Sequence, residues 1–374
     1  MHIDRVELYL FRIPLIAPFE TSFGITTDRD AILVKATSTE GIVGWGEYCG
    51  DGPGYSYETT ETGWHILKDY LIPFAKKAPF TDPRECVERF SWVRGHNFAK
   101  AALEAAIWDI AAQEQGLSLR DLIGKLYGRE MKDRVTVGVS IGIQPSTEKL
   151  IEKIHSFLQY GYLRIKMKIK PGRDVADARA ARAAIPDRML MVDANSAYTL
   201  KDAELLKQMD DLNLLMIEQP LGYDDIYEHS KLQPQLKTPI CLDESIHTPD
   251  HARMAIELGA CKIINIKQGR VGGLTNAIAV HDICDEHGVP VWCGGMLETG
   301  IGRALNLALA ALPNFKLPSD LSASNRYYNP DLIEPPFDIN TDGTLSVPTG
   351  KGLGVNLVPE RLDKLMERYQ EFRN

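Results

Sequence analysis

The sequence lacks the features that mark several large classes of protein. It has no excess of positive charge, because 51 acidic residues outnumber 42 basic ones and leave a formal net charge of −9. An acidic chain is a poor partner for nucleic acid or for an anionic membrane surface. No hydrophobic run approaches the roughly 18 residues of a membrane-spanning helix. We therefore expect neither nucleic acid nor a membrane among its partners.

Paired cysteines and targeting signals are also missing. The six cysteines are scattered and form no CxxC pair, which favours reduced thiols over zinc ligands or a disulfide framework. The first residues, MHIDRVELYLFRIPL, are acidic where a secretory signal needs a basic region and a long apolar core. No GxGxxG dinucleotide motif follows a first strand. These absences predict a cytoplasmic protein without a Rossmann-type cofactor site.

Two patterns of hydrophobic residues divide the chain into two parts. Residues 1–50 alternate with a period of two, as antiparallel strands do, and the alanine-rich stretch 98–116 has helical spacing and stops at Gly116. From about Val135, seven apolar runs recur, separated by amphipathic stretches, and a weaker eighth run follows at 317–324. Near-continuous apolar strands that alternate with helices predict an α/β fold with a parallel sheet, and this number of units favours a closed barrel.

The last part of the chain returns to strand and turn patterns and then to a charged amphipathic stretch. We predict a helix over 357–372, LVPERLDKLMERYQEF, that packs back on the N-terminal part. The expected domains are an α+β domain over 1–128, a barrel over 129–325, and a C-terminal segment over 326–374 that returns to the first domain.

Five of the apolar runs end in one charged residue each. These residues are Lys168, Asp193, Glu218, Asp243 and Lys267, separated by 25, 25, 25 and 24 residues. One βα unit takes about that length, so the five occupy equivalent places at the C-terminal rim of a parallel barrel, where active sites are built. The spacing therefore predicts that three carboxylates and two lysines meet in one mouth.

These residue types point to a metal and to proton transfer. Asp193, Glu218 and Asp243 offer oxygen ligands without histidine or cysteine, a set that selects Mg²⁺ and also suits Mn²⁺. Glu244 alternates to the other face of the strand and is expected to support the site. Burial and nearby cations would lower a lysine pKa from about 10.4 toward neutrality. A metal that neutralises a carboxylate makes its α-proton acidic, which predicts proton abstraction from a small-molecule carboxylate.

The lysine register has two solutions. Lys166, Lys168 and Lys170 alternate on one face, so both KMK and KIK fit a KxK pair. Pro171 lacks a ladder donor and favours a strand that ends there, which selects Lys166 and Lys168. A shift of two residues stays open.

Together these pieces resemble the enolase superfamily, in its muconate-lactonizing subgroup, over nearly the whole chain. The resemblance implies a (β/α)₇β TIM-like barrel, an α+β capping domain built from both chain ends, an essential Mg²⁺ and a homo-oligomer. The matching motifs are KMK (166–168), VDAN (192–195), IEQP (217–220), LDES (242–245) and INIKQGRVGG (264–273).

Within the subgroup the sequence is similar to o-succinylbenzoate synthases of menaquinone biosynthesis that also racemise N-succinylamino acids. This likeness rests on PFETSFG (18–24), VWCGGMLETGIGRA (291–304) and LPSDLSASNRYY (317–328). It implies that Lys168 removes the α-proton and then, as an acid, helps hydroxide leave in a syn dehydration. Lys267 would stabilise the anion, or serve the opposite face of the α-carbon in racemisation, and Lys166 completes the catalytic set.

Muconate cycloisomerase and dipeptide epimerase share this core chemistry and stay as alternatives. A barrel glycosidase is the alternative from a different class, since it also places carboxylates at strand ends, but it needs neither a metal nor a lysine pair. A non-catalytic protein that keeps the fold would have lost one of the lysines or acids.

Substrate contacts are less sharply indicated. The aromatic, glycine-rich loops PFETSFG and EYCGDGPGYSYET (47–59) either close over the mouth or pack as ordinary loops. Arg270 either tunes Lys267 or forms an ordinary surface ion pair. The expected substrate-binding residues are Phe19, Phe23, Tyr55, Ser140, Asn195 and, through backbone donors, Gly294, Gly295 and Met296.

Overall fold

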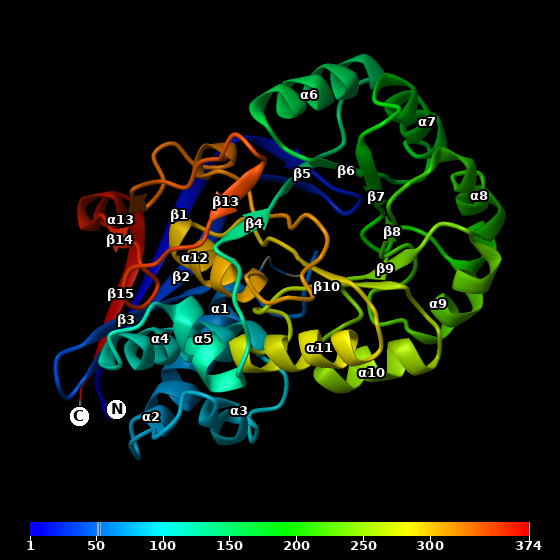
Figure 1. Cartoon of the computed structure of the whole chain (residues 1–374). Helices are drawn as coiled ribbons and strands as arrows, with labels where there is room; N and C mark the ends of the chain where they lie inside the picture. The colour runs from blue at the N-terminus through cyan, green and yellow to red at the C-terminus, as the bar shows by residue number, and fades with distance from the viewer. Residues whose placement is uncertain (51, 53, 374) are drawn as a thin grey trace.

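The chain forms an antiparallel sheet with covering helices and a parallel sheet ringed by helices. The computed structural model describes residues 1–50, 52 and 54–373. Figure 1 shows the parallel strands inside an arc of helices, and both chain ends beside the antiparallel sheet. The two parts correspond to the two patterns in the sequence.

The antiparallel sheet has the strand order β15–β1–β2–β3. Its inner face meets the long helix α4, and two glycines of β3 allow the close approach. A Cβ on Gly44 or Gly46 would lie 2.2 Å or 1.9 Å from a carbonyl oxygen of α4. The bounds are β1 (Ile3–Glu20), β2 (Ile25–Ser38), β3 (Val43–Tyr48), β15 (Met366–Arg373) and α4 (Asn97–Glu114).

The predicted meander and the predicted alanine-rich helix are both confirmed. The helical run ends just before Gly116, whose φ of 69° suits glycine. Shorter elements complete this part: α1 (Thr60–Ile66), a π-helical turn (Leu67–Leu71), α2 (Ile72–Ala75), α3 (Glu85–Phe90) and α5 (Leu119–Tyr127).

Seven parallel strands form the second sheet, and their order in space follows their order in the chain. Local capping signals bound the first connecting helix: α6 starts where Ser146 Oγ accepts from Lys149 N and stops at Gly161, with φ of 114°. The strands are β5 (Gly138–Ile141), β6 (Arg164–Lys168), β7 (Met189–Asp193), β8 (Ile217–Glu218), β9 (Ile240–Leu242), β10 (Ile263–Ile266) and β11 (Val291–Cys293). The helices are α6 (Thr147–Tyr160), α7 (Val175–Ala184), α8 (Ala203–Lys207), α9 (Tyr227–Leu232), α10 (Pro249–Glu257), α11 (Leu274–Glu286) and α12 (Gly300–Ala310).

The weaker eighth run contacts both edges of this sheet without forming a regular strand. Ser319 bridges to Val137 and Phe315 bridges to Val291, both in the parallel sense. Gly138 N donates to Ser319 O at 2.8 Å. The segment 315–320 therefore connects the β5 edge with the β11 edge.

The C-terminal segment returns to the N-terminal sheet, but its secondary structure differs from the predicted helix. The helix α13 (Pro359–Leu365) ends at Leu365, and residues 366–373 form β15, which pairs with β1 from Arg5↔Arg373 to Phe11↔Met366. The free edge of β1 offers a row of backbone partners, and this outweighs the local helical pattern. The other short elements are β4 (Arg134–Thr136), β12 (Ile333–Glu334), β13 (Thr344–Ser346), β14 (Asn356–Leu357) and 3₁₀ turns at 200–202, 210–212, 233–235 and 324–326.

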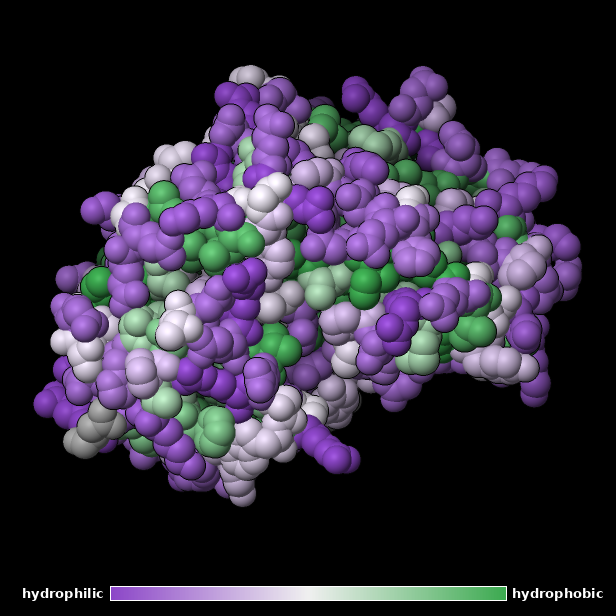
Figure 2. Space-filling view, turned by 60° about the horizontal axis from the view of Figure 1, so that its bottom comes forward, coloured by the Kyte–Doolittle hydropathy of each residue, from purple (hydrophilic) through white to green (hydrophobic). Residues whose placement is uncertain are grey.

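The surface is mainly polar. Figure 2 shows hydrophilic side chains over most of one face, with hydrophobic side chains in smaller patches between them. Among the described residues, no helix combines the length and apolar character that a membrane span requires.

Candidate active site

The C-terminal ends of the parallel strands bring the five spaced residues together. Lys168 pairs in register with Asp193, and Asp193 with Glu218, at the ends of β6, β7 and β8. Asp243 directly follows β9, and Lys267 directly follows β10. Their side chains are at most 8% exposed. The structure thus gathers the predicted charges into one buried mouth.

Each of the three carboxylates faces a cation. Lys168 Nζ donates to Asp193 Oδ2 at 2.6 Å, and Lys267 Nζ donates to Asp243 Oδ2 at 2.8 Å. Lys166 Nζ donates to Glu218 Oε2 at 3.0 Å. In the described part of the chain, no three His, Cys, Asp or Glu side chains converge closely enough to hold a metal ion. The carboxylates are thus held apart by ammonium groups.

Burial and neighbouring charges shift these groups in opposite directions. Burial and the nearby Asp193 raise the pKa of Glu218 well above its usual value. Burial also acts on Asp243, but Arg270 and Lys267 outweigh it and hold the pKa of Asp243 low. Burial favours the predicted fall in the lysine pKa, yet the Asp243 charge outweighs it and raises the pKa of Lys267. The pKa of Lys267 beside Asp243 is thus raised, and the fall toward neutrality, which we expect for a lysine beside a divalent cation, stays a prediction.

Asn195 links Lys168 to Glu244. Its Oδ1 accepts from Lys168 Nζ at 2.7 Å, and its Nδ2 donates to Glu244 Oε1 at 2.8 Å. Burial and the charge of Asp243 raise the pKa of Glu244 to about 7. Because Glu244 accepts from the Asn195 amide, it orients the side chain that holds Lys168.

Arg270 is a buried partner of Asp243, so the surface ion pair considered for it is wrong. Its Nη1 donates to Asp243 Oδ1, and its Nε donates to Ile246 O at 2.9 Å. Tyr55 Oη accepts from Lys267 Nζ at 2.6 Å and from Arg270 Nη1 at 3.3 Å. Tyr55, which follows β3 of the antiparallel sheet, thus contacts Lys267 in the mouth.

A small cavity of about 50 Å³ lies between the lysines and the antiparallel part. It brings together most of the predicted substrate contacts and excludes Gly294 from its lining. The turn between β1 and β2 supplies one wall. The lining residues are Phe19, Thr21, Phe23, Thr26, Tyr55, Ser140, Lys166, Lys168, Asn195, Lys267, Gly295, Met296, Leu297, Asp320 and Tyr327.

Two of the predicted backbone donors already donate to protein acceptors. Gly294 N donates to Ile266 O at 3.1 Å, and Met296 N donates to Glu298 Oε2 at 2.8 Å. The prediction that both amides face a ligand is therefore wrong. Gly294 has a different use, since a Cβ there would lie 2.3 Å from Asn265 Oδ1.

The sequence reasoning missed Asp320 and Tyr327. Ser140 Oγ donates to Asp320 Oδ2 at 2.6 Å, and Lys166 Nζ lies 3.0 Å from the same oxygen. Tyr327 meets Phe19 edge to face, with ring centroids 6.3 Å apart. The available signal was the single charge in the weaker eighth run, which repeats the pattern of the other strands.

The third alternating lysine lies outside the cavity lining. Lys170 Nζ donates to Glu20 Oε1 at 2.9 Å, and its side chain is 36% exposed. The two lysines of KMK face the cavity, and Lys170 ties the end of β1 to the parallel sheet. Of the predicted loop 47–59, Asp51 and Pro53 lie outside the described residues.

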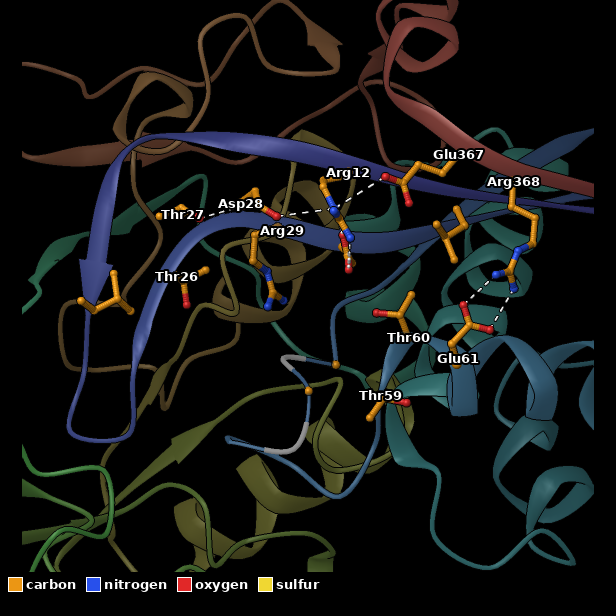
Figure 3. A pocket seen from close by; sticks show the side chains of 15 residues that line it. Arg12, Thr26, Thr27, Asp28, Arg29, Thr59, Thr60, Glu61, Glu367 and Arg368 are labelled. Atoms are coloured by element: carbon orange, nitrogen blue, oxygen red, sulfur yellow. Dashed lines mark hydrogen bonds and ion pairs between the residues drawn. The ribbon is translucent and has the colours of Figure 1, made fainter.

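A larger cavity of about 640 Å³ lies away from these lysines. Figure 3 shows its charged side chains, from β1, β2, α1 and β15, turned toward one another. Arg12 Nε lies 2.6 Å from Asp30 Oδ1, and Arg368 Nη2 lies 2.7 Å from Glu61 Oε1. Thr26 lines both cavities. The larger one lacks the carboxylate and lysine set of the mouth.

Family comparisons agree with this geometry. Residues 149–361 match the family described as enolase C-terminal domain-like, and residues 5–124 match the N-terminal domain of mandelate racemase / muconate lactonizing enzyme. The chain belongs to the enolase superfamily. This assignment overturns the glycosidase alternative, and members of the superfamily use Mg²⁺ with a lysine or histidine base.

Relatives in the superfamily match the whole chain. An o-succinylbenzoate synthase from Geobacillus kaustophilus is 48% identical over 373 residues, which cover 100% of this chain and 97% of the relative. An N-succinylamino acid racemase from an Amycolatopsis species is 46% identical, with 98% of each chain covered.

Solved superfamily structures have the same fold. An enolase superfamily member from Listeria innocua has a TM-score of 0.94 at 41% identity, with 100% of this chain and 99% of that chain covered. A dipeptide epimerase from Cytophaga hutchinsonii, in complex with Mg and D-Ala-L-Val, has a TM-score of 0.89 at 25% identity, covering 99% and 100%.

Proposed function

We propose that this chain is a magnesium-dependent o-succinylbenzoate synthase with N-succinylamino acid racemase activity. The observation that carries the proposal is the placement of Lys168 and Lys267 on the lining of one cavity, beside three buried carboxylates. The substrate assignment is supported by full-length relatives of both names at 46% and 48% identity. The substrate class is a small-molecule carboxylate.

The chemistry of the donor set suits a hard divalent cation held by Asp193, Glu218 and Asp243, whose oxygens accept from lysine ammonium groups in this structure. All three carboxylates are buried on consecutive strands, and burial with like charge raises the pKa of Glu218. A divalent cation would relieve that repulsion, and oxygen donors alone suit Mg²⁺ or Mn²⁺. When bound, the ion would stabilise the negative charge that develops on the substrate carboxylate.

Lys168 is the base that takes the α-proton. In dehydration, its ammonium form then returns a proton to the departing hydroxide, so water leaves and the ring becomes aromatic. Asn195 orients its amine through the 2.7 Å hydrogen bond. Lys267 remains cationic and stabilises the anionic intermediate. In racemisation, Lys168 and Lys267 exchange protons on opposite faces of the α-carbon.

The cavity wall supports a substrate with a ring or an acyl chain. Phe19, Phe23 and Tyr55 give it an apolar, aromatic side, and closure of this side excludes water from the lysines. Ser140 and Gly295 are the remaining polar contacts that we assign to the substrate. Muconate cycloisomerase and dipeptide epimerase remain the alternative activities that the assay must separate.

We also propose a more detailed fold assignment, which covers the eighth strand of the barrel and the bounds of the domains. We infer that 315–320 acts as the eighth strand of a (β/α)₇β TIM-like barrel, supported by its bridges to Val137 and Val291. The corresponding domains are a capping domain over 1–128, the barrel over 129–325, and a segment over 326–374 that returns to the cap. A homo-oligomer in the cytoplasm is our expectation, and light scattering on the purified protein tests the oligomeric state.

The function is tested by a paired assay on the Mg²⁺-loaded protein and its Lys168→Ala variant. Ultraviolet absorbance follows o-succinylbenzoate formation, and NMR in D₂O follows exchange of the α-proton of N-succinylamino acids. We expect both reactions in the wild type and neither in the variant. A wild type that performs neither reaction contradicts the proposal, and muconates and dipeptides are then the substrates to assay.

A further inference from the structure

Lys166 is surrounded by three carboxylates. Its Nζ lies 3.0 Å from Glu218 Oε2, 3.3 Å from Asp193 Oδ2 and 3.0 Å from Asp320 Oδ2. The same nitrogen lies 4.8 Å from the centroid of the Trp292 ring. The side chain is 4% exposed. A buried ammonium requires a charged partner, because an unpaired one loses its hydration without compensation.

The three carboxylates reach Lys166 from two sides of its strand. Asp193 and Glu218 end β7 and β8, which follow β6 in the sheet. Asp320 comes from the other side, next to β5, where Gly138 N donates to Ser319 O at 2.8 Å. The two sides are therefore chemically separable: one holds the proposed metal ligands and the other does not.

We propose that Asp320 is a positioning residue that keeps Lys166 in place when a divalent cation draws on the oxygens of Asp193 and Glu218. The inference rests on the proposed function only in taking those two carboxylates as metal ligands. A bound cation reduces the negative charge that they offer to Lys166. Asp320 then supplies the remaining full negative charge at 3.0 Å.

Asp320 is itself firmly held. Ser140 Oγ donates to its Oδ2 at 2.6 Å, and its backbone N donates to Cys293 O at 2.8 Å. Gly295 leaves room for its backbone, since a Cβ there would lie 2.7 Å from Asp320 O. A carboxylate fixed at both backbone and side chain can fix its lysine partner in turn.

Lys168 lacks this second support. Its Nζ pairs with Asp193 at 2.6 Å and with the neutral amide of Asn195 at 2.7 Å. Within the described chain, Asp193 is the one carboxylate in ion-pair distance of Lys168. With a cation at Asp193, Lys168 would be free for proton transfer, whereas Lys166 would stay anchored to Asp320 as a cation. Asp320 is what separates the roles of the two lysines in KMK.

The test is Asp320→Asn, which keeps the size of the side chain and removes its charge. Lys166 then pairs more strongly with Asp193 and Glu218 and competes with the metal. We expect the Mg²⁺ Kd, measured by titration calorimetry without substrate, to weaken by about 10-fold. We expect kcat to fall by about 10- to 100-fold, with a smaller change in KM.

A matched control is Asp109→Asn, which alters another buried aspartate, 3% exposed, that accepts from Trp45 N and Leu353 N in the capping part. It should keep the wild-type Mg²⁺ Kd and kcat. In a Lys166→Met background, Asp320→Asn should no longer change the Mg²⁺ Kd, because the competing ammonium is gone.

A folded Asp320→Asn protein with wild-type Mg²⁺ Kd and kcat overturns the proposal, as does an undiminished effect in the Lys166→Met background. If Asp320→Asn fails to fold, Asp320→Glu decides: the displaced carboxylate should shift the Mg²⁺ Kd in the same direction by less, and an unchanged Kd overturns the proposal. Because the Kd needs no turnover, it stays decisive if the proposed reaction is not observed.

Discussion

Buried carboxylates occur in two regions of the molecule, and each region neutralises them differently. In the capping part, Glu104 accepts from Thr275 N at 3.1 Å and also from Leu274 N, at the start of α11. Glu47 accepts from Thr299 N at 2.9 Å and from Gly302 N at 2.8 Å, at the start of α12. In the mouth at the ends of the parallel strands, the carboxylates face the ammonium groups of lysines and, at Asp243, also the guanidinium of Arg270.

The difference separates structural groups from reactive ones. A backbone N–H at a helix N-terminus is fixed by the helix and gives up its acceptor only when the helix unravels. An ammonium on a flexible side chain can move aside for a metal ion or exchange a proton. Burial of a carboxylate therefore says little about its role, and the kind of partner says more.

The largest effect is expected for Glu218→Gln, which removes one negative charge from the mouth and keeps the shape of the side chain. We expect kcat to fall by at least about 10²-fold, because the charge that holds the cation is reduced. In EDTA, the melting temperature of this variant should hold or rise, since a buried charge beside Asp193 is relieved. Initial rates and differential scanning fluorimetry measure the two effects. Full activity in this variant would place the metal elsewhere.

Removal of the metal tests the same difference between carboxylates of the mouth and carboxylates at helix starts. Mg²⁺ at 100 times its Kd should add about 2.7 kcal/mol to the free energy of unfolding, because it binds the folded state. Urea unfolding in MgCl₂ and in EDTA measures this difference. The Glu218→Gln variant should lose most of the stabilisation and Glu104→Gln should keep it. Equal stabilisation in both variants would argue for binding outside the mouth.

The structural role of the carboxylates at helix starts, Glu47 and Glu104, is tested by Glu104→Ala. Two backbone amides at the start of α11 and the indole N–H of Trp108 would lose their acceptor, at a cost of about 2 kcal/mol in the free energy of unfolding. The folded fraction should keep its kcat, in contrast to Glu218→Gln. Glu88→Ala, at an exposed position, is the control and should change neither quantity. A large fall in kcat for Glu104→Ala would contradict the division into two sets.

The smallest expected effect is a pH dependence. Burial raises the pKa of Glu104 from 4.5 to about 7. A carboxyl with a raised folded pKa contributes stability below its unfolded pKa and loses it as the pH rises through the folded value. The wild type should therefore lose about 1 kcal/mol more than Glu104→Gln between pH 6 and pH 7.5. Parallel unfolding curves at both pH values would contradict the raised pKa.

The charged residues of the mouth could be predicted because local patterns in the sequence determine their positions. A charge at the end of each apolar run and a constant repeat length are enough to place Lys168, Asp193 and Glu218 at one rim. The spacing alone does not fix the lysine register, since three lysines alternate equally, and Pro171 is the local cue that favours Lys166 and Lys168. What separates Lys170 from the pair is its bond to Glu20, 150 residues away, and no local pattern carries that contact.

Other features depend on partners that the local sequence does not name. Asp320 lies in a run too irregular to be assigned as a strand, although its bridges join both edges of the sheet. Met296 has a backbone amide that Glu298 occupies, which only the folded loop reveals. The stretch after Leu365 has a helical pattern, but the open edge of β1 converts it into a strand.

The pairing of β1 with β15 also constrains how the chain is made. Glu7 meets Tyr369 across this pair, at a sequence separation of 362 residues. On the ribosome, the first strand therefore emerges long before the partner that covers its edge. That edge stays a template for pairing with other nascent chains until the partner arrives.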